Sequence, residues 1–227
     1  MQFSLVITTY NRFDTFLKEN IIKYLENPYI SEIIISDDCS NDYEKLINYF
    51  FNDPKIKIIK QPKNIGALRN KISACTYATN NWICLMDSDN FADINYFEAL
   101  ITCWNSHEPN ETIIYCASKA LPTFDFTQYN NEILDKNNFN TMNECLLNDG
   151  NHVFHKNILV YLLPILDNDI NPYAVDVKFM IYNWFKNDVK IKVVPDMTYY
   201  HAMHNESLYI QNASNSINFD KTFHWQF

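Results

Sequence analysis

The chain has 227 residues, enough to bury the core of one large domain. Hydrophobic residues make up 47% of it and charged residues 20%, an ordinary globular composition that argues against disorder. The formal net charge of -9 and the lack of a basic stripe argue against a nucleic-acid partner, whereas acidic groups gathered in a cleft could recruit a divalent cation.

Cysteine usage and the apolar segments indicate a cellular compartment. The cysteines form no Cys-x-x-Cys pair and no metal-ligand spacing, so we expect reduced thiols in a cytosolic protein. The first residues, "MQFSLVITTY", show neither the basic region nor the cleavage site of a secretory signal. No segment approaches the ~20 apolar residues that span a bilayer. We therefore expect a soluble cytoplasmic protein without a transmembrane segment, and the sequence leaves open whether it forms a homo-oligomer.

The N-terminal half alternates short apolar runs with helically spaced apolar residues. The runs are too short for core helices and rich in β-formers, which predicts strands at residues 3–8, 32–36, 55–59, 82–86 and 112–116. The third run alternates and should lie nearer an edge of the sheet. Helical spacing follows each of the first four runs and predicts helices at residues 13–25, 43–50, 65–75 and 94–104.

Repeated strand–helix–strand units predict an α/β fold with a Rossmann-like, mostly parallel sheet and helices on both faces. In such sheets the ligand crevice lies beyond the carboxyl ends of the strands. Polar clusters follow the first four strands: "TYNR" at 9–12, "DDCSND" at 37–42, "QPKNIG" at 61–66 and "DSDN" at 87–90. We expect all of them to meet at one edge of the sheet.

The second half is less regular. Residues 117–150 are polar and predict a loop with a short helix, and 152–163 predict a strand and then a helix. The remaining pattern predicts a helix at 173–185, strands at 189–195 and 196–201, and a tail with a helix and an aromatic end at 205–227. No linker or repeat divides the chain, so we expect a single domain, 1–227, with parts 1–116, 117–204 and 205–227.

Asp87 and Asp89 lie one residue apart directly after a buried strand. Two close carboxylates repel unless a cation lies beside them, and oxygen ligands of this kind suit Mg²⁺ or Mn²⁺. The alternative is a polar turn that caps the helix beginning near Asp93.

The segment "NIGALRN" at 64–70 places a scarce glycine, Gly66, between a strand and a helix. A glycine there lets backbone N–H groups approach a phosphate at the helix N-terminus, and Arg69 could pair with a diphosphate. The alternative is a structural turn and a solvated arginine. The acids of "SDDCSND" could accept hydrogen bonds from a base or a ribose, or cap the next helix. The chain contains neither G-x-G-x-x-G nor a Walker lysine motif.

Four motifs in this order, "SLVITTYNR", "EIIISDDCSND", "NIGALRN" and "WICLMDSDN", resemble the nucleotide-sugar-binding half of family 2 glycosyltransferases with the GT-A fold. The resemblance covers the first ~115 residues well and the rest patchily. It implies transfer of a sugar from a UDP-sugar to an acceptor hydroxyl, usually with inversion and with Mn²⁺ or Mg²⁺. The acceptor is then a glycan, a lipid-linked sugar or a protein, and a lipid-linked acceptor would be reached from the periphery of a membrane.

The resemblance also assigns roles to residues of the donor half. Arg12 forms a wall of the nucleoside pocket together with Thr8 and Tyr10, and Asp38 contacts the base. Asp87 faces the ribose and donor sugar, and Asp89 binds the metal. The complete donor set implied by the resemblance is Thr8, Tyr10, Arg12, Asp38, Asn64, Gly66, Arg69 (facing the diphosphate), Asp87, Ser88 and Asp89.

The catalytic base belongs to the second half, because inverting transfer needs a carboxylate that takes the acceptor proton. The resemblance places it at Asp176, although Val175 replaces the usual Glu of the family. Asp167 and Asp169 lie nearby as competitors. The alternative role for Asp176 is a first-turn acid that stabilises its helix.

The resemblance further places His201 as a second metal ligand, with His204 as the fallback. A lone histidine near aromatic residues is otherwise structural. On the acceptor side it indicates Asn151, His152 and Trp184, and Gly150 fits a tight approach of the backbone.

Three other functions fit the sequence less well. A phosphohydrolase wants its D-x-D after the first strand, followed by Gly and Thr, but Asn90 and Phe91 follow this one. A nucleotidyltransferase wants a glycine-rich first loop with a lysine, which "TTYNRFD" lacks. A nucleotide-sugar binder without catalysis is supported only by Val175, and binding without turnover would favour it.

Overall fold

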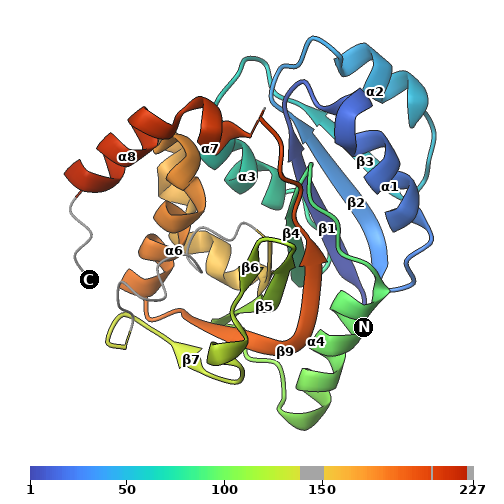
Figure 1. Ribbon diagram of the computed structural model, residues 1–227. Helices are drawn as coiled ribbons and strands as arrows, with labels where there is room; N and C mark the ends of the chain where they lie inside the picture. Colours follow the sequence, from blue (N-terminus) through green and yellow to red (C-terminus); the bar gives the residue numbers. More distant parts are fainter. Residues whose placement is uncertain (139–150, 206, 224–227) are drawn as a thin grey trace.

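The computed structural model describes residues 1–138, 151–205 and 207–223. Within them a single sheet has the strand order β3-β2-β1-β4-β8-β5-β9-β7, with β6 paired to β5 (Figure 1). The sheet therefore runs through both halves of the chain.

The first half follows the predicted alternation closely. Four parallel neighbours form this side of the sheet: β1 (Phe3–Thr9), β2 (Ile30–Asp37), β3 (Ile56–Lys60) and β4 (Trp82–Asp87). The predicted edge position of the third strand is confirmed, because β3 ends the sheet. The helices that follow them are η1 (Phe13–Leu17, a π-helical turn) running into α1 (Lys18–Leu25), then α2 (Tyr43–Tyr49), α3 (Ala67–Cys75) and α4 (Ile94–Ser106).

The second half extends the sheet in mixed directions. β8 (His152–His155) is antiparallel to both β4 and β5 (Ile113–Leu121) and lies between them. β5 pairs in parallel with β9 (Lys190–Tyr200), whose outer side carries the short antiparallel β7 (Ile133–Leu134). β6 (Phe124–Asp125) and the 3₁₀ turn η2 (Thr127–Tyr129) occupy a region predicted as loop with a short helix.

Other predicted bounds were wrong where proline or a left-handed residue intervenes. The two predicted strands at 189–201 are one strand, β9, with a register shift around Pro195 and Asp196; Asp196 has a φ of 61°. The helix predicted in the second part of 152–163 is instead two 3₁₀ segments, η4 (Lys156–Tyr161) and η5 (Leu163–Asp167), and a proline lies in the first turn of the second.

The helix predicted at 173–185 begins later than expected. A 3₁₀ turn, η6 (Tyr173–Val175), precedes α6 (Asp176–Lys186), and Tyr173 has a φ of 54°. In the tail, the chain forms α7 (Leu208–Gln211) and α8 (Ala213–Thr222). The last four residues of the predicted aromatic end lie outside the described residues, as does Gly150.

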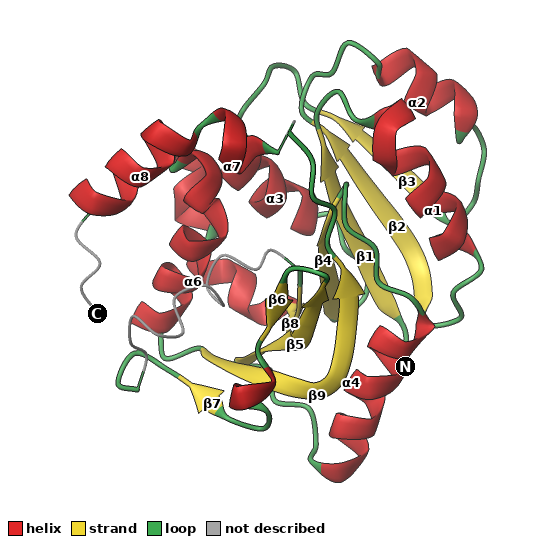
Figure 2. Ribbon diagram, viewed as in Figure 1, coloured by secondary structure: helices red, strands yellow, loops and turns green. Residues whose placement is uncertain are grey.

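The sheet is covered on both faces, which confirms the predicted architecture (Figure 2). Side chains such as Leu5 and Ile7 of β1 face a cluster with α1, α2 and α4, whereas Val6 faces a cluster with α3 and α6. Because side chains alternate along a strand, the same division holds in β4. Ile83 and Leu85 lie on the α3–α6 side, which places Asp87 on that side as well.

Candidate functional site

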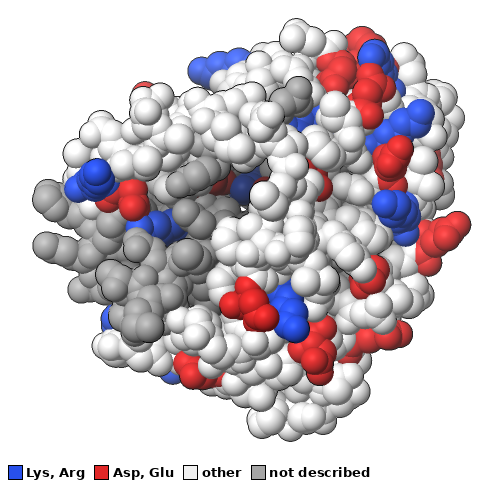
Figure 3. Space-filling view, viewed as in Figure 1, with Lys and Arg blue, Asp and Glu red and all other residues white. Residues whose placement is uncertain are grey.

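The segments that follow β1, β2, β4 and β9 meet beyond the carboxyl ends of these strands. Asp38 N–H donates to Thr9 O at 2.9 Å, and Asn41 N–H donates to Asn11 Oδ1 at 2.8 Å, so the first two loops are joined. Phe91, in the loop after β4, exchanges backbone hydrogen bonds with Tyr200 at the end of β9. Figure 3 shows basic and acidic side chains recessed in a hollow on this side of the molecule.

Asp38 organises the junction between β3 and α3. Its Oδ1 accepts from Ile65 N–H at 2.7 Å and its Oδ2 from Gly66 N–H at 3.0 Å. Burial raises the pKa of Asp38 and outweighs the two backbone hydrogen bonds that lower it. Gly66 has a φ of 84° and a ψ of 158°, a conformation open essentially only to glycine. The backbone N–H groups at this junction were expected to bind a phosphate. In the structure they bind Asp38, the residue predicted to contact the base.

Asp89 lies in an ion-paired group with Arg12 and His204. Arg12 Nη1 donates to Asp89 Oδ2, and His204 Nε2 lies 2.9 Å from the same oxygen and 3.1 Å from Arg12 Nη1. The side chains are about one-sixth exposed, with values of 15% for Arg12 and His204 and 17% for Asp89. Phe16 supports both partners, with its ring 5.8 Å from the Arg12 guanidinium carbon and 4.6 Å from the His204 ring.

His204, the fallback of the sequence analysis, is thus the histidine that adjoins Asp89. His201 has other contacts: its backbone N–H donates to Leu121 O at 2.7 Å, its ring lies 5.6 Å from that of Phe124, and it is near enough to Asp87 to help lower the pKa of that carboxyl. The chain leaves β9 at Tyr200 and needs the next few residues to turn back over the crevice, which brings position 204 rather than 201 to Asp89.

The pair of Asp89 Oδ2 and His204 Nε2 fits the edge of a metal site. Adjacent ligand atoms of an octahedral ion with bonds of about 2.1 Å lie about 3.0 Å apart, and these two are 2.9 Å apart. Carboxylate oxygens suit Mg²⁺ and Mn²⁺, and imidazole is a ligand of transition metals. Among the described residues no group of three or more His, Cys, Asp and Glu side chains is placed to hold a metal. Further positions would have to be filled by water or a substrate phosphate.

Buried amides fix the D-x-D turn in place. Asn20 of α1 donates to the carbonyls of Ser88 at 3.3 Å and Asn90 at 3.2 Å, and Asn151 Oδ1 accepts from Asp87 N–H at 3.0 Å. Ala202 N–H donates to Asn90 Oδ1 at 3.1 Å, so the turn is also tied to the segment that carries His204. Asn20 was not predicted as a site residue, although an asparagine within the apolar stripe of a helix is a signal for a buried hydrogen bond.

Lys71 joins the donor side of the crevice to the predicted base. Its Nζ lies 2.9 Å from Asp87 Oδ1 and 2.8 Å from Asp176 Oδ2, and its side chain is 6% exposed. Burial lowers the pKa of Lys71, but the two carboxylates outweigh it and raise the pKa above its ordinary value. For the Asp87 carboxyl, burial acts in the opposite direction and raises the pKa, but the Lys71 ammonium outweighs it and holds the pKa of Asp87 below the usual value. Lys71 was missed as well, although it shares the buried face of α3 with Leu68 and Cys75.

The acceptor-side candidates differ in position. His152 is buried beside this ion triad, and burial lowers its pKa to about 3 against the opposing effect of Asp87, so its imidazole is neutral. Its Nε2 atom has no hydrogen-bond partner among the described residues. Trp184 is fully buried in the core and donates to Ile158 O at 2.9 Å. The structure therefore brings Asn151 and His152 to the site and places Trp184 away from it.

The remaining donor candidates lie around the rim. Tyr10 is 48% exposed and Thr8 half-buried. Arg69 donates to Ile65 O at 2.9 Å and to Asn168 O at 3.2 Å, and it pairs with Asp169 at 3.3 Å. Asn64 accepts from Gly66 N–H at 3.2 Å. Arg69 thus links the α3 loop to the segment of the competitor Asp169.

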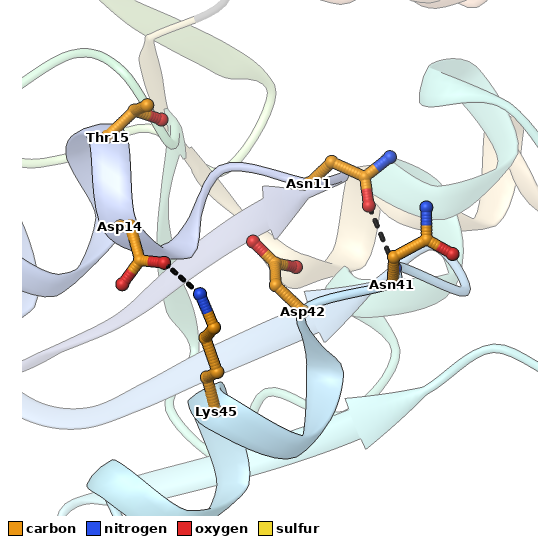
Figure 4. A pocket seen from close by; sticks show the side chains of 6 residues that line it. All are labelled: Asn11, Asp14, Thr15, Asn41, Asp42 and Lys45. Atoms are coloured by element: carbon orange, nitrogen blue, oxygen red, sulfur yellow. Dashed lines mark hydrogen bonds and ion pairs between the residues drawn. The ribbon is translucent and has the colours of Figure 1, made fainter.

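An open pocket of about 450 Å³ lies beside the first two loops (Figure 4). The ion pair between Lys45 and Asp14 lies along one side, and the Asn11–Asn41 hydrogen bond along another. The pocket is lined by Asn11, Asp14, Thr15, Asn41, Asp42 and Lys45. It contains none of the predicted donor residues, so we do not assign it to the donor.

Comparisons with known proteins agree with this geometry. The sequence model of the family described as Glycosyl transferase family 2 matches residues 4–164. A dolichyl-phosphate beta-glucosyltransferase, ALG5C, of Trichomonas vaginalis is 36% identical over 78 residues, 33% of this chain and 23% of that protein.

Solved structures share the fold at low sequence identity. S. aureus TarS 1-349 in complex with UDP-GlcNAc has a TM-score of 0.68 and 17% identity, covering 91% of this chain and 60% of that one. GalNAc-T7 with UDP, GalNAc and Mn²⁺ has a TM-score of 0.67 and 14% identity, covering 99% and 49%. The chain thus spans only part of each of these relatives. Within the described residues, no helix is both long and apolar enough to cross a membrane.

Proposed function

Because the chain belongs to glycosyl transferase family 2, we propose that it transfers a sugar from a UDP-sugar to a hydroxyl of a glycan, lipid-linked or protein acceptor, with a divalent cation and with inversion. The observation that carries the proposal is the convergence of Asp38, Asp87 and Asp89 with His204 at one edge of the sheet. The UDP-GlcNAc of TarS and the UDP and Mn²⁺ of GalNAc-T7 support it by analogy of fold.

The donor side would use Asp38 and Asp87. Each Asp38 oxygen accepts one backbone hydrogen bond and keeps a second lone pair, which can accept the N–H of a uracil. Lys71 occupies Asp87 Oδ1, and the Asp87 side chain is 31% exposed, so its other oxygen can accept from ribose or sugar hydroxyls. Asp89 and His204 would hold Mn²⁺ or Mg²⁺, which when bound offsets the charge on the departing diphosphate.

The acceptor side would use Asp176 as the base. The acceptor hydroxyl forms a bond to the anomeric carbon while the bond from that carbon to the diphosphate oxygen breaks, and Asp176 takes the hydroxyl proton. Asp176 and Asp87 lie within 3 Å of the same ammonium group, which supports a base that acts next to the donor sugar. Asp169 is fully exposed and paired with Arg69, and Asp167 is exposed as well, whereas Asp176 lies buried beside Lys71, which favours Asp176 over both competitors.

The donor site is tested by thermal unfolding with UDP, GDP and dTDP, each with and without Mn²⁺, on wild type and Asp89→Ala. Ligand at a hundred times its Kd stabilises by ~2.7 kcal/mol, which is roughly 5–10 °C for a chain of this size. We expect a shift with UDP that needs Mn²⁺ and is lost in Asp89→Ala. No shift with any nucleotide would contradict the proposed donor site.

The base is tested by the rate of sugar transfer or donor hydrolysis in Asp176→Asn, with Asp169→Asn as the matched control. General base catalysis contributes about 10²–10⁴-fold, so Asp176→Asn should lose activity by that factor while its UDP-dependent thermal shift stays.

One observation favours a second function, a binder without catalysis: Val175, in place of the family's Glu, is buried. UDP-sugar binding without turnover in wild type would support that function.

A further inference from the structure

Arg12 occupies the position of a cation between the two expected metal ligands. Its Nη1 atom contacts Asp89 Oδ2 and lies 3.1 Å from His204 Nε2, while these two atoms are 2.9 Å apart. The three side chains come from the segments after β1, β4 and β9, which are far apart in the sequence. The Arg12 Nη1 atom thus lies beside Asp89 Oδ2 and His204 Nε2, the two atoms whose separation fits adjacent ligands of Mn²⁺.

Hydrogen-bond chemistry makes this arrangement a substitute for a bound ion. A guanidinium has donors and no acceptor, and a carboxylate oxygen offers lone pairs. The Asp89 carboxylate and the His204 Nε2 atom thus face one positive group, as the ligand atoms of a metal site face their ion.

We propose that Arg12 is a resident counter-cation that competes with the divalent metal for Asp89 and His204, and that a nucleoside diphosphate draws it away. This rests on the proposed metal site. A planar guanidinium pairs with phosphate oxygens through two parallel hydrogen bonds. When a diphosphate binds beside Asp89, the Arg12 guanidinium leaves the carboxylate and pairs with the phosphate. Asp89 and His204 are then free to bind the metal. Metal and nucleotide therefore strengthen each other's binding by the same factor.

The surroundings of Arg12 favour such an exchange. Arg12 precedes the π-helical turn at Phe13–Leu17, and turns of this kind recur at functional sites. Phe13 N–H is held by Asp42 Oδ2 at 3.0 Å, so the backbone beyond Arg12 is anchored to the second loop. The Phe16 ring gives the guanidinium an apolar support on one side. The side chain can therefore change partners without movement of the backbone.

The test measures Mn²⁺ binding to the protein, with and without UDP. The electron paramagnetic resonance signal of free Mn²⁺ reports how much metal is unbound. Arg12→Gln removes the charge at similar length, and Arg12→Lys keeps it. Lys45→Gln is the matched control, because it removes one positive charge from the same edge where Lys45 pairs with Asp14, not with Asp89. Asp89→Asn removes the metal ligand. Circular dichroism and thermal unfolding confirm that each variant is folded.

Wild type should bind Mn²⁺ weakly without UDP and more tightly with it. Arg12→Gln should bind Mn²⁺ alone roughly ten- to a hundredfold more tightly, the range for loss of a hydrogen bond to a charged group. The factor by which UDP improves Mn²⁺ binding should fall in Arg12→Gln to the part that direct metal–phosphate coordination supplies, fall less in Arg12→Lys, and be unchanged in Lys45→Gln.

Two outcomes would overturn the inference and separate it from the proposed function. If Mn²⁺ binds in an Asp89-dependent manner but Arg12→Gln leaves its affinity unchanged, the metal site stands and the role of Arg12 is wrong. If no variant binds Mn²⁺, with or without UDP, the metal site itself is wrong and the inference fails with it.

Discussion

Replacement of Lys71 by methionine should destabilise the fold more than any surface charge change. Lys71 is 6% exposed and Asp176 7% exposed, so the variant leaves a carboxylate buried without its cation. Removal of one partner from a buried pair costs about 3–5 kcal/mol. Asp87 is 31% exposed, so water screens much of its share and the cost stays within that range. At 2–4 °C per kcal/mol for a domain of this size, the Tm should fall by roughly 6–20 °C.

The assay is urea unfolding followed by circular dichroism, on Lys71→Met, Lys71→Arg and the double variant Lys71→Met/Asp176→Asn. The double variant should recover part of the loss, because the buried charge is gone. Lys45→Met is the control for an exposed pair, with side chains 62% and 59% exposed, and should change stability by less than about 1 kcal/mol. Equal losses of unfolding free energy in Lys71→Met and Lys45→Met would refute the reasoning. A double variant that is less stable than Lys71→Met would refute it as well, because removal of the buried charge would then have brought no gain.

Two further predictions concern the stability of the fold. Burial raises the pKa of Glu32, but hydrogen bonds from Ser4, Thr79 and Asn80 outweigh it and lower the pKa. The ionised carboxylate therefore stabilises the native state above the pKa of the unfolded chain. This contribution is lost as the pH falls through the pKa of the folded state. Glu32→Gln should therefore cost about 1 kcal/mol at pH 7 and nothing near pH 2, measured by urea unfolding; a pH-independent cost would contradict this. Gly66→Ala should cost roughly 1–3 kcal/mol although no atom lies within 4 Å of an added Cβ, because the backbone conformation alone excludes a side chain; a neutral effect on the Tm would show that the loop relaxes.

Much of the donor half could be predicted because its signals are local. The strands from Phe3 to Asp87 are short apolar runs with polar ends, and parallel strands bring those ends to one edge. Asp38, Asp87 and Asp89 were therefore expected at one edge of the sheet, and they lie beyond the ends of β2 and β4 at that edge. Gly66 was expected at a strand-to-helix junction and is found there, although its N–H serves Asp38 rather than an open anion site.

The parts that could not be predicted depend on contacts between distant segments. Lys71 reads as a solvated lysine until α6 brings Asp176 to it, 105 positions later in the chain. The choice between His201 and His204 depends on where β9 ends and how the chain turns afterwards. The bulge at Pro195 and Asp196 interrupts the apolar pattern without ending the strand, so one strand was predicted as two.

The position of β8 has a consequence for attempts to recombine this protein with its relatives. A chain that ends at residue 116 would lack β8 and leave the hydrogen-bonding edges of both β4 and β5 bare. Bare edges of this kind pair with other chains, so such a fragment should aggregate rather than serve as a portable donor module. The same strand begins at His152, and Asn151 directly before it accepts a hydrogen bond from Asp87 N–H. An exchange of acceptor halves between relatives therefore has to move a strand from the middle of the sheet, and new acceptor specificity is reached more readily by substitutions in the loops than by a swap of whole halves.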